Sequence, residues 1–280
     1  MRALFPRFVE AEAANGSVIR ALRKMQGPRN ADGAFRSFPR GLDEIIEGLM
    51  RAVPKESVRL NSTVARVDAA RGVFTMHLED RPPIHAGAVI LACPAFSTAD
   101  LVRAIDVRLA DLCGSIAYLS TATVVLAFPR EAVHHPLGGT GFVVPKSEGL
   151  NITAGAWISS KWPHRAPPSH ALLRAFLGGA RDPNVLAKND RELTEIALNE
   201  LGKILGIRGS PTFTRVYRWN RASPQLEVGH LELVAKIDAQ LAHHPGLFVS
   251  AAGVRGVGIP DCIADARTTA GMAADYVKHH

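Results

Sequence analysis

The segment at residues 247–263 constrains the fold more than any other part of the sequence. It begins with an apolar run rich in β-branched residues, which predicts a buried strand. Gly256 and Gly258 follow, and Pro260 stands where a helix would begin. The segment therefore predicts a strand, a glycine turn and a helix N-terminus. Such a terminus presents unpaired N–H groups and a partial positive charge to an anion or an electron-rich ring.

The helix expected after this turn has a face of small and apolar side chains, which predicts close packing against a sheet. The face consists of Ile263, Ala266, Ala270, Ala273, Ala274 and Val277.

Composition narrows the class of protein. With 280 residues, 47% of them hydrophobic and 21% charged, the chain is an ordinary globular one. A net charge of +7 favours anionic partners. The basic residues are scattered and aromatic residues make up only 6%, which argues against nucleic-acid binding. We expect a carboxylate-bearing small molecule or a membrane surface instead.

The cysteines and histidines predict neither disulfides nor a metal site. Cys93, Cys113 and Cys262 form no CxxC pair, which is typical of a reducing compartment. Several of the eleven histidines are direct neighbours, a spacing unsuited to shared metal ligation. The longest apolar stretch, residues 121–128, is far shorter than the ~20 residues of a spanning helix. We expect a cytoplasmic protein, and a peripheral attachment to the inner membrane stays open.

Hydrophobic periodicity predicts two blocks of structure. The first has a helix at 42–53 and strands at 58–67, 73–78 and 88–92. The second is rich in strands and has one amphipathic helix, at 193–205. Its predicted strands are 121–128, 141–144, 152–158, 172–177 and 212–217. If the strand that starts at Leu247 joins the sheet of strand 88–92, the second block is an insertion.

The stretch at residues 218–230, RWNRASPQLEVGH, and the later turn at 256–263, GVGIPDCI, support a more specific interpretation. In order and spacing they resemble the C-terminal signature of the flavin-dependent protoporphyrinogen oxidases. Residues 60–64, 88–95 and 141–145 resemble that family in the same order. The family begins with a strand and a Gly-x-Gly-x-x-Gly motif, which this sequence lacks. The resemblance therefore covers the C-terminal portion of the family only.

The resemblance implies an α/β and α+β fold of the amine-oxidase kind. A discontinuous FAD-binding domain, here without its N-terminal glycine-rich strand–turn–helix, would carry an inserted mixed-sheet substrate domain. The incomplete FAD-binding domain would be residues 36–96 and 245–280, and the substrate-binding domain residues 97–244. Residues 1–35 would form a helical segment of the region that faces substrate or membrane.

The resemblance also implies positions for the cofactor, FAD. Val64 would border its adenine side. Gly256, Val257 and Gly258 would meet the flavin, with the helix N-terminus stabilising negative charge on the reduced ring. Trp219 would pack near the isoalloxazine.

For the substrate, the resemblance implies a tetrapyrrole pocket lined by Val143, Trp157 and Phe176. Each would equally suit a core position on a strand. The family's arginine for a porphyrinogen propionate would precede Met1. Whether the substrate is protoporphyrinogen or coproporphyrinogen stays open.

The implied reaction is oxidation of a porphyrinogen to a porphyrin in heme biosynthesis, with dioxygen reoxidising the flavin. We identify no catalytic residue, because the cofactor carries this chemistry. Two alternatives stay open: another amine-oxidase-type flavoenzyme, such as an amine oxidase or a desaturase relative, and a non-catalytic fragment or subunit. A homodimer stays open as well.

Overall fold

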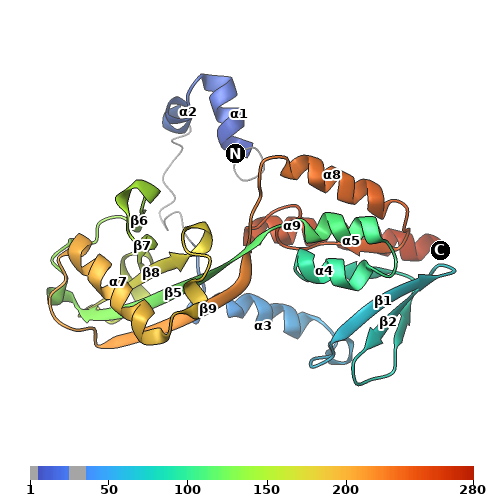
Figure 1. Cartoon of the computed structure of the whole chain (residues 1–280), viewed down its shortest axis with the longest axis horizontal. Helices are drawn as coiled ribbons and strands as arrows, with labels where there is room; N and C mark the ends of the chain where they lie inside the picture. The colour runs from blue at the N-terminus through green and yellow to red at the C-terminus, as the bar shows by residue number, and fades with distance from the viewer. Residues whose placement is uncertain (1–5, 25–35) are drawn as a thin grey trace. The chain divides into compact units, whose positions relative to one another are not determined.

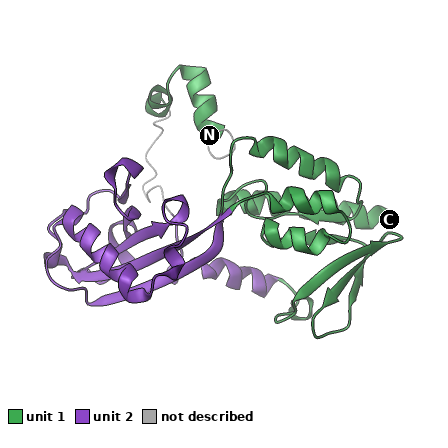
Figure 2. Cartoon of the chain, viewed as in Figure 1, with its two compact units in different colours: residues 1–29, 53–117, 224–280 green, residues 30–52, 118–223 purple. Residues whose placement is uncertain are grey.

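The computed structural model describes residues 6–24 and 36–280 (Figure 1). The chain divides into two compact units (Figure 2). Unit 1 consists of Met1–Arg29, Val53–Ala117 and Pro224–His280, and unit 2 of Asn30–Ala52 and Tyr118–Ser223. The predicted domain boundaries place residues 36–52 with the cofactor domain, whereas the clustering of contacts assigns Asn30–Ala52 to unit 2.

Unit 2 is built on a five-stranded sheet with the strand order β6-β7-β8-β5-β9. Its pairs β6–β7, β7–β8 and β8–β5 are antiparallel. The strands are β5 (Tyr118–Pro129), β6 (Gly141–Val143), β7 (Ile152–Trp157), β8 (His170–Gly178) and β9 (Phe213–Pro224). All five predicted strands of this block are present, and β9 runs seven residues beyond the predicted end at 217.

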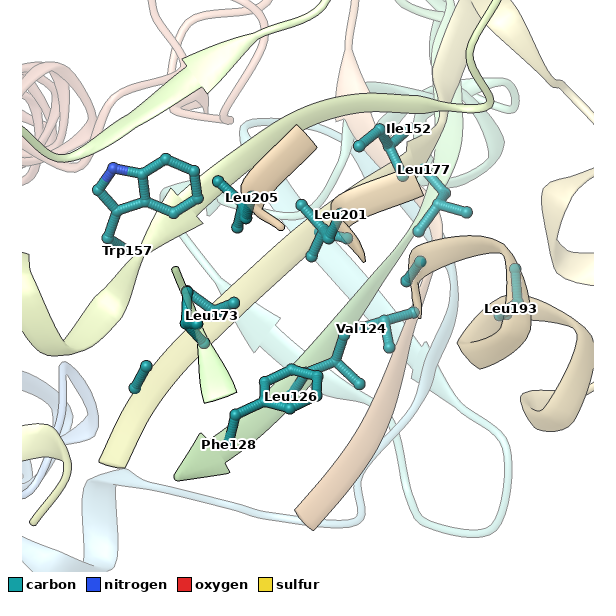
Figure 3. Close-up of a cluster of buried hydrophobic side chains, with 14 of the residues drawn as sticks. Val124, Leu126, Phe128, Ile152, Trp157, Leu173, Leu177, Leu193, Leu201 and Leu205 are labelled. Atoms are coloured by element: carbon teal, nitrogen blue, oxygen red, sulfur yellow. The ribbon is translucent and has the colours of Figure 1, made fainter. Parts of the chain in front are cut away.

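Helix α7 (Asp190–Leu205) covers one face of this sheet and encloses the core of unit 2. It begins with a capping box, in which Asn189 accepts from the backbone N–H of Glu192 and Glu192 accepts from that of Asn189. It ends at Gly206, whose φ of 61° is the left-handed conformation that suits glycine. Figure 3 shows the buried side chains of strands and helix, among them Leu126, Leu173 and Leu201.

Unit 1 contains two small sheets. The antiparallel sheet consists of β1 (Val64–Ala70), β2 (Val73–Leu78) and β3 (Ile84–Ala86). In the second sheet, β4 (Val89–Leu91) pairs in parallel with β10 (Leu247–Val249), and Leu247 lies opposite Val89. The predicted pairing of the strands near 88–92 and 247–252 is therefore found.

The predicted strand at 58–67 is wrong in its first half, because β1 starts only at Val64. Asn61 has a φ of 51°, a left-handed conformation that a strand cannot contain but that asparagine tolerates. The Ser62 hydroxyl donates to the carbonyl of Leu60, which closes a local turn in place of a strand.

Four helices belong to the C-terminal three quarters of unit 1. They are α4 (Ala95–Val102), α5 (Val107–Gly114), α8 (His230–Leu241) and α9 (Ile259–His279). The predicted packing face of α9 is mostly wrong. Ile263 and Val277 are exposed, and the buried residues of the helix are Thr269 and Ala273. Alanines are distributed around the whole helix, so their pattern does not select one face.

The remaining helices lie nearer the N-terminus or within unit 2. They are α1 (Pro6–Asn15), α2 (Val18–Lys24), α3 (Asp43–Ala52) and the short α6 (Ile158–Lys161). The predicted helical segment 1–35 includes α1 and α2, and its residues 1–5 and 25–35 lie outside the described residues. No helix within residues 6–24 and 36–280 is long and apolar enough to cross a membrane.

Candidate functional site

The sheet of unit 2 has one open face, opposite the face that α7 covers. Along β8 the residues with odd numbers, such as Leu173 and Ala175, are buried in the core. The residues with even numbers, such as Arg174 and Phe176, point to the other face and are partly exposed. This alternation is the period of two that a strand imposes, and it gives unit 2 a surface that its own core does not use.

A row of side chains crosses this open face from one edge of the sheet to the other. Val143 lies opposite Ala154, which lies opposite Phe176, which in turn lies opposite Thr123. Trp219 of β9 completes the row, because its indole N–H points to the Thr123 hydroxyl at 3.4 Å. Val143 is 80% exposed and Trp219 is 49% exposed. The open face therefore carries a flat apolar and aromatic surface, which here includes predicted substrate and cofactor residues together.

Cations accompany the aromatic rings on the same face. The guanidinium of Arg174 lies 5.9 Å from the centroid of the Phe176 ring. That of Arg215 lies 5.3 Å from the Tyr217 ring, and Tyr217 stacks with Trp219 at 6.5 Å. None of the five strands contains an Asp or a Glu. The strands thus combine aromatic surface with positive charge, which suits a flat anionic ligand.

Trp157 is not part of this surface. It is 3% exposed and belongs to the core on the opposite side of the sheet. Its ring packs against Phe142 and His135 at centroid distances of 5.4 and 5.5 Å. The structure brings Val143 and Phe176 together and places Trp157 away from them, so a direct contact of Trp157 with a ligand on the open face is not supported.

The predicted glycine turn lies in unit 1, between β10 and α9. Gly258 precedes the helix and no side chain caps its N-terminus. A Cβ at Gly256 would come within 2.5 Å of the Asp261 Cβ, and one at Gly258 within 2.9 Å of an Asp261 carboxylate oxygen. Both positions therefore need glycine because the Asp261 side chain folds back over the turn. Val257, between them, is 42% exposed.

Two residues not selected from the sequence hold this turn in place. The buried His230 ring contacts the carbonyl of Val254 through Nε2 at 2.8 Å. Arg255 donates to the carbonyl of Val249 at 2.6 Å and pairs with Asp238 and Asp265. His230 belongs to the motif at 218–230, and that position was the available signal for it. Arg255 could be recognised only from partners that are distant in sequence.

Val64 lies in the three-stranded sheet of unit 1, at the start of β1 and opposite Leu78. It is partly exposed. Within unit 1 it belongs to a different sheet from the β10–α9 turn.

One carboxylate of unit 1 has a strongly shifted pKa. Burial acts to raise the pKa of Asp106, but hydrogen bonds from the Leu109 N–H, His244 and Gln240 outweigh it and lower the pKa to about 2. Asp106 is the N-cap of α5 and ties that helix to the end of α8. Its role is thus structural. No group of three or more His, Cys, Asp or Glu suited to a metal occurs in the described part of the chain.

The sequence matches a family model, that of the flavin containing amine oxidoreductases, over residues 1–273. The chain belongs to this family. Its members are flavin-containing, so membership implies FAD as the cofactor. The predicted family and the mixed α/β fold class are confirmed.

Individual relatives give more detail. The chain is 29% identical to the coproporphyrinogen III oxidase of Bacillus subtilis (strain 168), over 98% of this chain and 59% of that protein. It is 24% identical to the chloroplastic protoporphyrinogen oxidase of Nicotiana tabacum, over 100% of this chain and 56% of that protein.

A solved structure agrees with these relatives. The crystal structure of a protein assigned as a protoporphyrinogen oxidase in Exiguobacterium sp. 255-15 superposes with a TM-score of 0.83 and 30% identity. The match covers 99% of this chain and 59% of that one. The chain thus spans somewhat more than half the length of these relatives.

Proposed function

We propose that this chain takes part in the FAD-dependent oxidation of a porphyrinogen to a porphyrin in heme biosynthesis. The observation that carries the proposal is the row of Val143, Phe176 and Trp219 on the open sheet face, within five strands free of carboxylates. A porphyrinogen is large, mostly apolar and anionic, and this face offers apolar area and positive charge together. The porphyrinogen oxidases among the relatives support the same substrate class.

The residues of the open face would bind and orient the substrate. The Val143 side chain and the Phe176 and Trp219 rings would cover part of the macrocycle and exclude water from it. The Thr123 hydroxyl fixes the Trp219 indole, so this ring would not need to be ordered when the substrate binds. We assign no acid or base, since bound FAD supplies the two-electron chemistry.

The glycine turn of unit 1 fits the flavin end of FAD. The turn carries no side chain at Gly256 and Gly258, and α9 is a helix of 21 residues whose N-terminal N–H groups are not capped by a side chain. Together these features would let a ring approach the backbone closely and would favour negative charge on it. Val257 and Val64 remain proposed contacts of the cofactor.

The pyrophosphate of FAD has no matching site in the sequence, since no Gly-x-Gly-x-x-Gly occurs in the 280 residues. We therefore propose that stable FAD binding requires further polypeptide that supplies this motif. The isolated chain should bind FAD weakly or not at all, as measured by flavin absorbance after desalting. Stoichiometric flavin on the isolated chain would contradict this.

The turn itself is tested in the protein completed by such a segment. Gly256→Val would place a side chain where the Asp261 side chain lies and should abolish flavin retention. Gly271→Val, a glycine on α9 with open space around it, is the matched control and should keep its flavin. Normal FAD content in Gly256→Val would show that the turn is only structural.

Dioxygen as electron acceptor, a peripheral contact with the inner membrane and a homodimer are further parts of the proposal. The decisive assay gives the completed protein both coproporphyrinogen and protoporphyrinogen in the presence of oxygen. We expect porphyrin fluorescence and hydrogen peroxide to appear together. Turnover of a primary amine or a polyene, with neither porphyrinogen oxidised, would overturn the proposal.

A further inference from the structure

Arg174 is placed beside the aromatic row of the open face rather than at its rim. It lies on β8 two residues before Phe176, opposite Ala156 of β7 and Val125 of β5. Both neighbours have small or medium side chains, which leaves the guanidinium between the Phe176 ring, at 5.9 Å, and the solvent side of the sheet. Its position is set by three strands at once.

The charge of Arg174 is only partly compensated by the described residues. Its Nε atom is buried and has no hydrogen-bond partner there. Burial lowers the pKa of the guanidinium below its usual value, and Tyr217 offsets this in part. A buried donor without an acceptor costs free energy, so this arrangement is expected to be more favourable when an anion reaches it.

A second cation has a similar setting on β9. Arg215 lies over the Tyr217 ring, which stacks with Trp219. Each arginine is thus next to an aromatic ring of the open face, and no strand of the sheet offers a carboxylate to either. The pattern fits a ligand that is flat and apolar at its centre and carries carboxylates at its edge.

We propose that Arg174 binds a carboxylate of the ligand that lies on the open face of the unit 2 sheet, with Arg215 as a second anion-binding residue. The proposal rests on the proposed porphyrinogen substrate and names the group that fixes its orientation. A guanidinium can donate two parallel hydrogen bonds to one carboxylate, which gives direction as well as attraction. Arg174 is therefore a binding residue and takes no part in the oxidation itself.

The test uses the 280-residue chain and two probes that share one ring system. Coproporphyrin III carries four carboxylates, and its tetramethyl ester carries none. Binding is followed by the anisotropy of porphyrin fluorescence. Arg174→Met keeps the length and apolar stem of the side chain, and we expect it to bind coproporphyrin III about 10- to 100-fold more weakly, with unchanged affinity for the ester.

Two further variants make the result specific. Arg174→Lys keeps the charge but loses the fork, so its loss of affinity for coproporphyrin III should be smaller. Arg191→Met is the matched control. Arg191 lies on α7, across the sheet, and its side chain is 86% exposed, so both affinities should match the wild type. Near-UV circular dichroism shows whether each variant is folded, and Arg174→Lys carries the test if Arg174→Met is not.

The outcomes separate this proposal from the function on which it rests. Unchanged affinity of the Arg174 variants for coproporphyrin III would overturn the carboxylate site and leave the porphyrin-binding face standing. An equal loss for acid and ester would assign Arg174 to packing against Phe176 and would overturn the site as well. Failure of the wild-type chain to bind either porphyrin would overturn both proposals.

Discussion

The two units of this chain are stabilised in different ways. Eight of the twelve largest fully buried side chains belong to unit 2, and only four belong to unit 1. In unit 2 they form one continuous core between the sheet and α7. Unit 1 has a two-stranded parallel sheet, and α9 exposes apolar residues such as Ile263 and Met272 along its length.

Polar contacts take over much of the stabilisation in unit 1. Asp106 joins the start of α5 to Gln240 and His244 near the end of α8. Arg255 and Asp265 join the loop after β10 to the helices on either side. Parallel sheets are usually larger and covered on both faces, and exposed apolar helix faces commonly mark contact surfaces. The comparison indicates that unit 2 can stabilise itself, whereas unit 1 has surface suited to further polypeptide.

The largest expected effect tests the core of unit 2. Leu201→Ala should lower the free energy of unfolding of this unit by about 3–5 kcal/mol, because the side chain is fully buried and the cavity cannot collapse. All three tryptophans, Trp157, Trp162 and Trp219, lie in unit 2, so urea unfolding followed by tryptophan fluorescence reports on it. Ile237→Ala, in unit 1, should leave this transition in place. A shift as large as that of Leu201→Ala would show that the units unfold together.

A smaller effect is expected at the polar contact that unit 2 does bury. Glu200, 8% exposed, accepts from the backbone N–H groups of Asn151 and Ile152 and from the Asn151 side chain. Glu200→Gln replaces one acceptor by a donor and should cost about 2 kcal/mol in the same fluorescence transition. Glu195→Gln, at an exposed pair on the same helix, is the control and should cost less than about 0.5 kcal/mol. Equal costs would contradict a special role for Glu200.

The smallest effect tests the polar contacts of unit 1. Asp106→Asn should reduce helix stability by about 1 kcal/mol, because a charged N-cap and its bonds to His244 and Gln240 are weakened. The measurement is thermal unfolding followed by circular dichroism at 222 nm. Asp111→Asn, an exposed aspartate of the same helix, is the control.

The effect of Asp106→Asn also has a defined pH dependence. The pKa of Asp106 is lowered in the folded protein from 3.8 to about 2, so its carboxylate stabilises the fold fully above pH ~4. This contribution is lost as the pH falls through that range toward 2. The difference between wild type and variant should therefore shrink below pH ~4. A difference that stays constant down to pH ~2 would contradict the assigned cause.

Much of the architecture could be predicted because hydrophobic period and chain punctuation determine it locally. The strands of unit 2, α7 and the β10–α9 turn follow from such patterns. The extent of β9 could not be predicted in this way. Arg218 pairs with Asp190, and Asn220 accepts a hydrogen bond from Ser120. These partners lie far away in sequence and extend the strand through residues whose own pattern is polar.

The candidate site was partly predictable for the same reason. Val143 and Phe176 lie in one row, but Trp157 has the other parity in the register of β7 and faces the core. A register is a relation between strands, and a single strand does not contain it. Arg174 could have been selected from the sequence, because strand alternation alone places it on the face of Phe176.

The chain enters and leaves the unit 2 sheet at one place. The backbone N–H of Gln225, just after β9, donates to the carbonyl of Ala117, just before β5, at 2.8 Å. An insert whose two ends are adjacent adds little loop-closure entropy to the fold that carries it. Evolution can therefore replace residues 118–223 as one continuous cassette, and with them the ligand surface, by a single recombination event. New substrates would then arise in this family without any change to the residues that hold the cofactor.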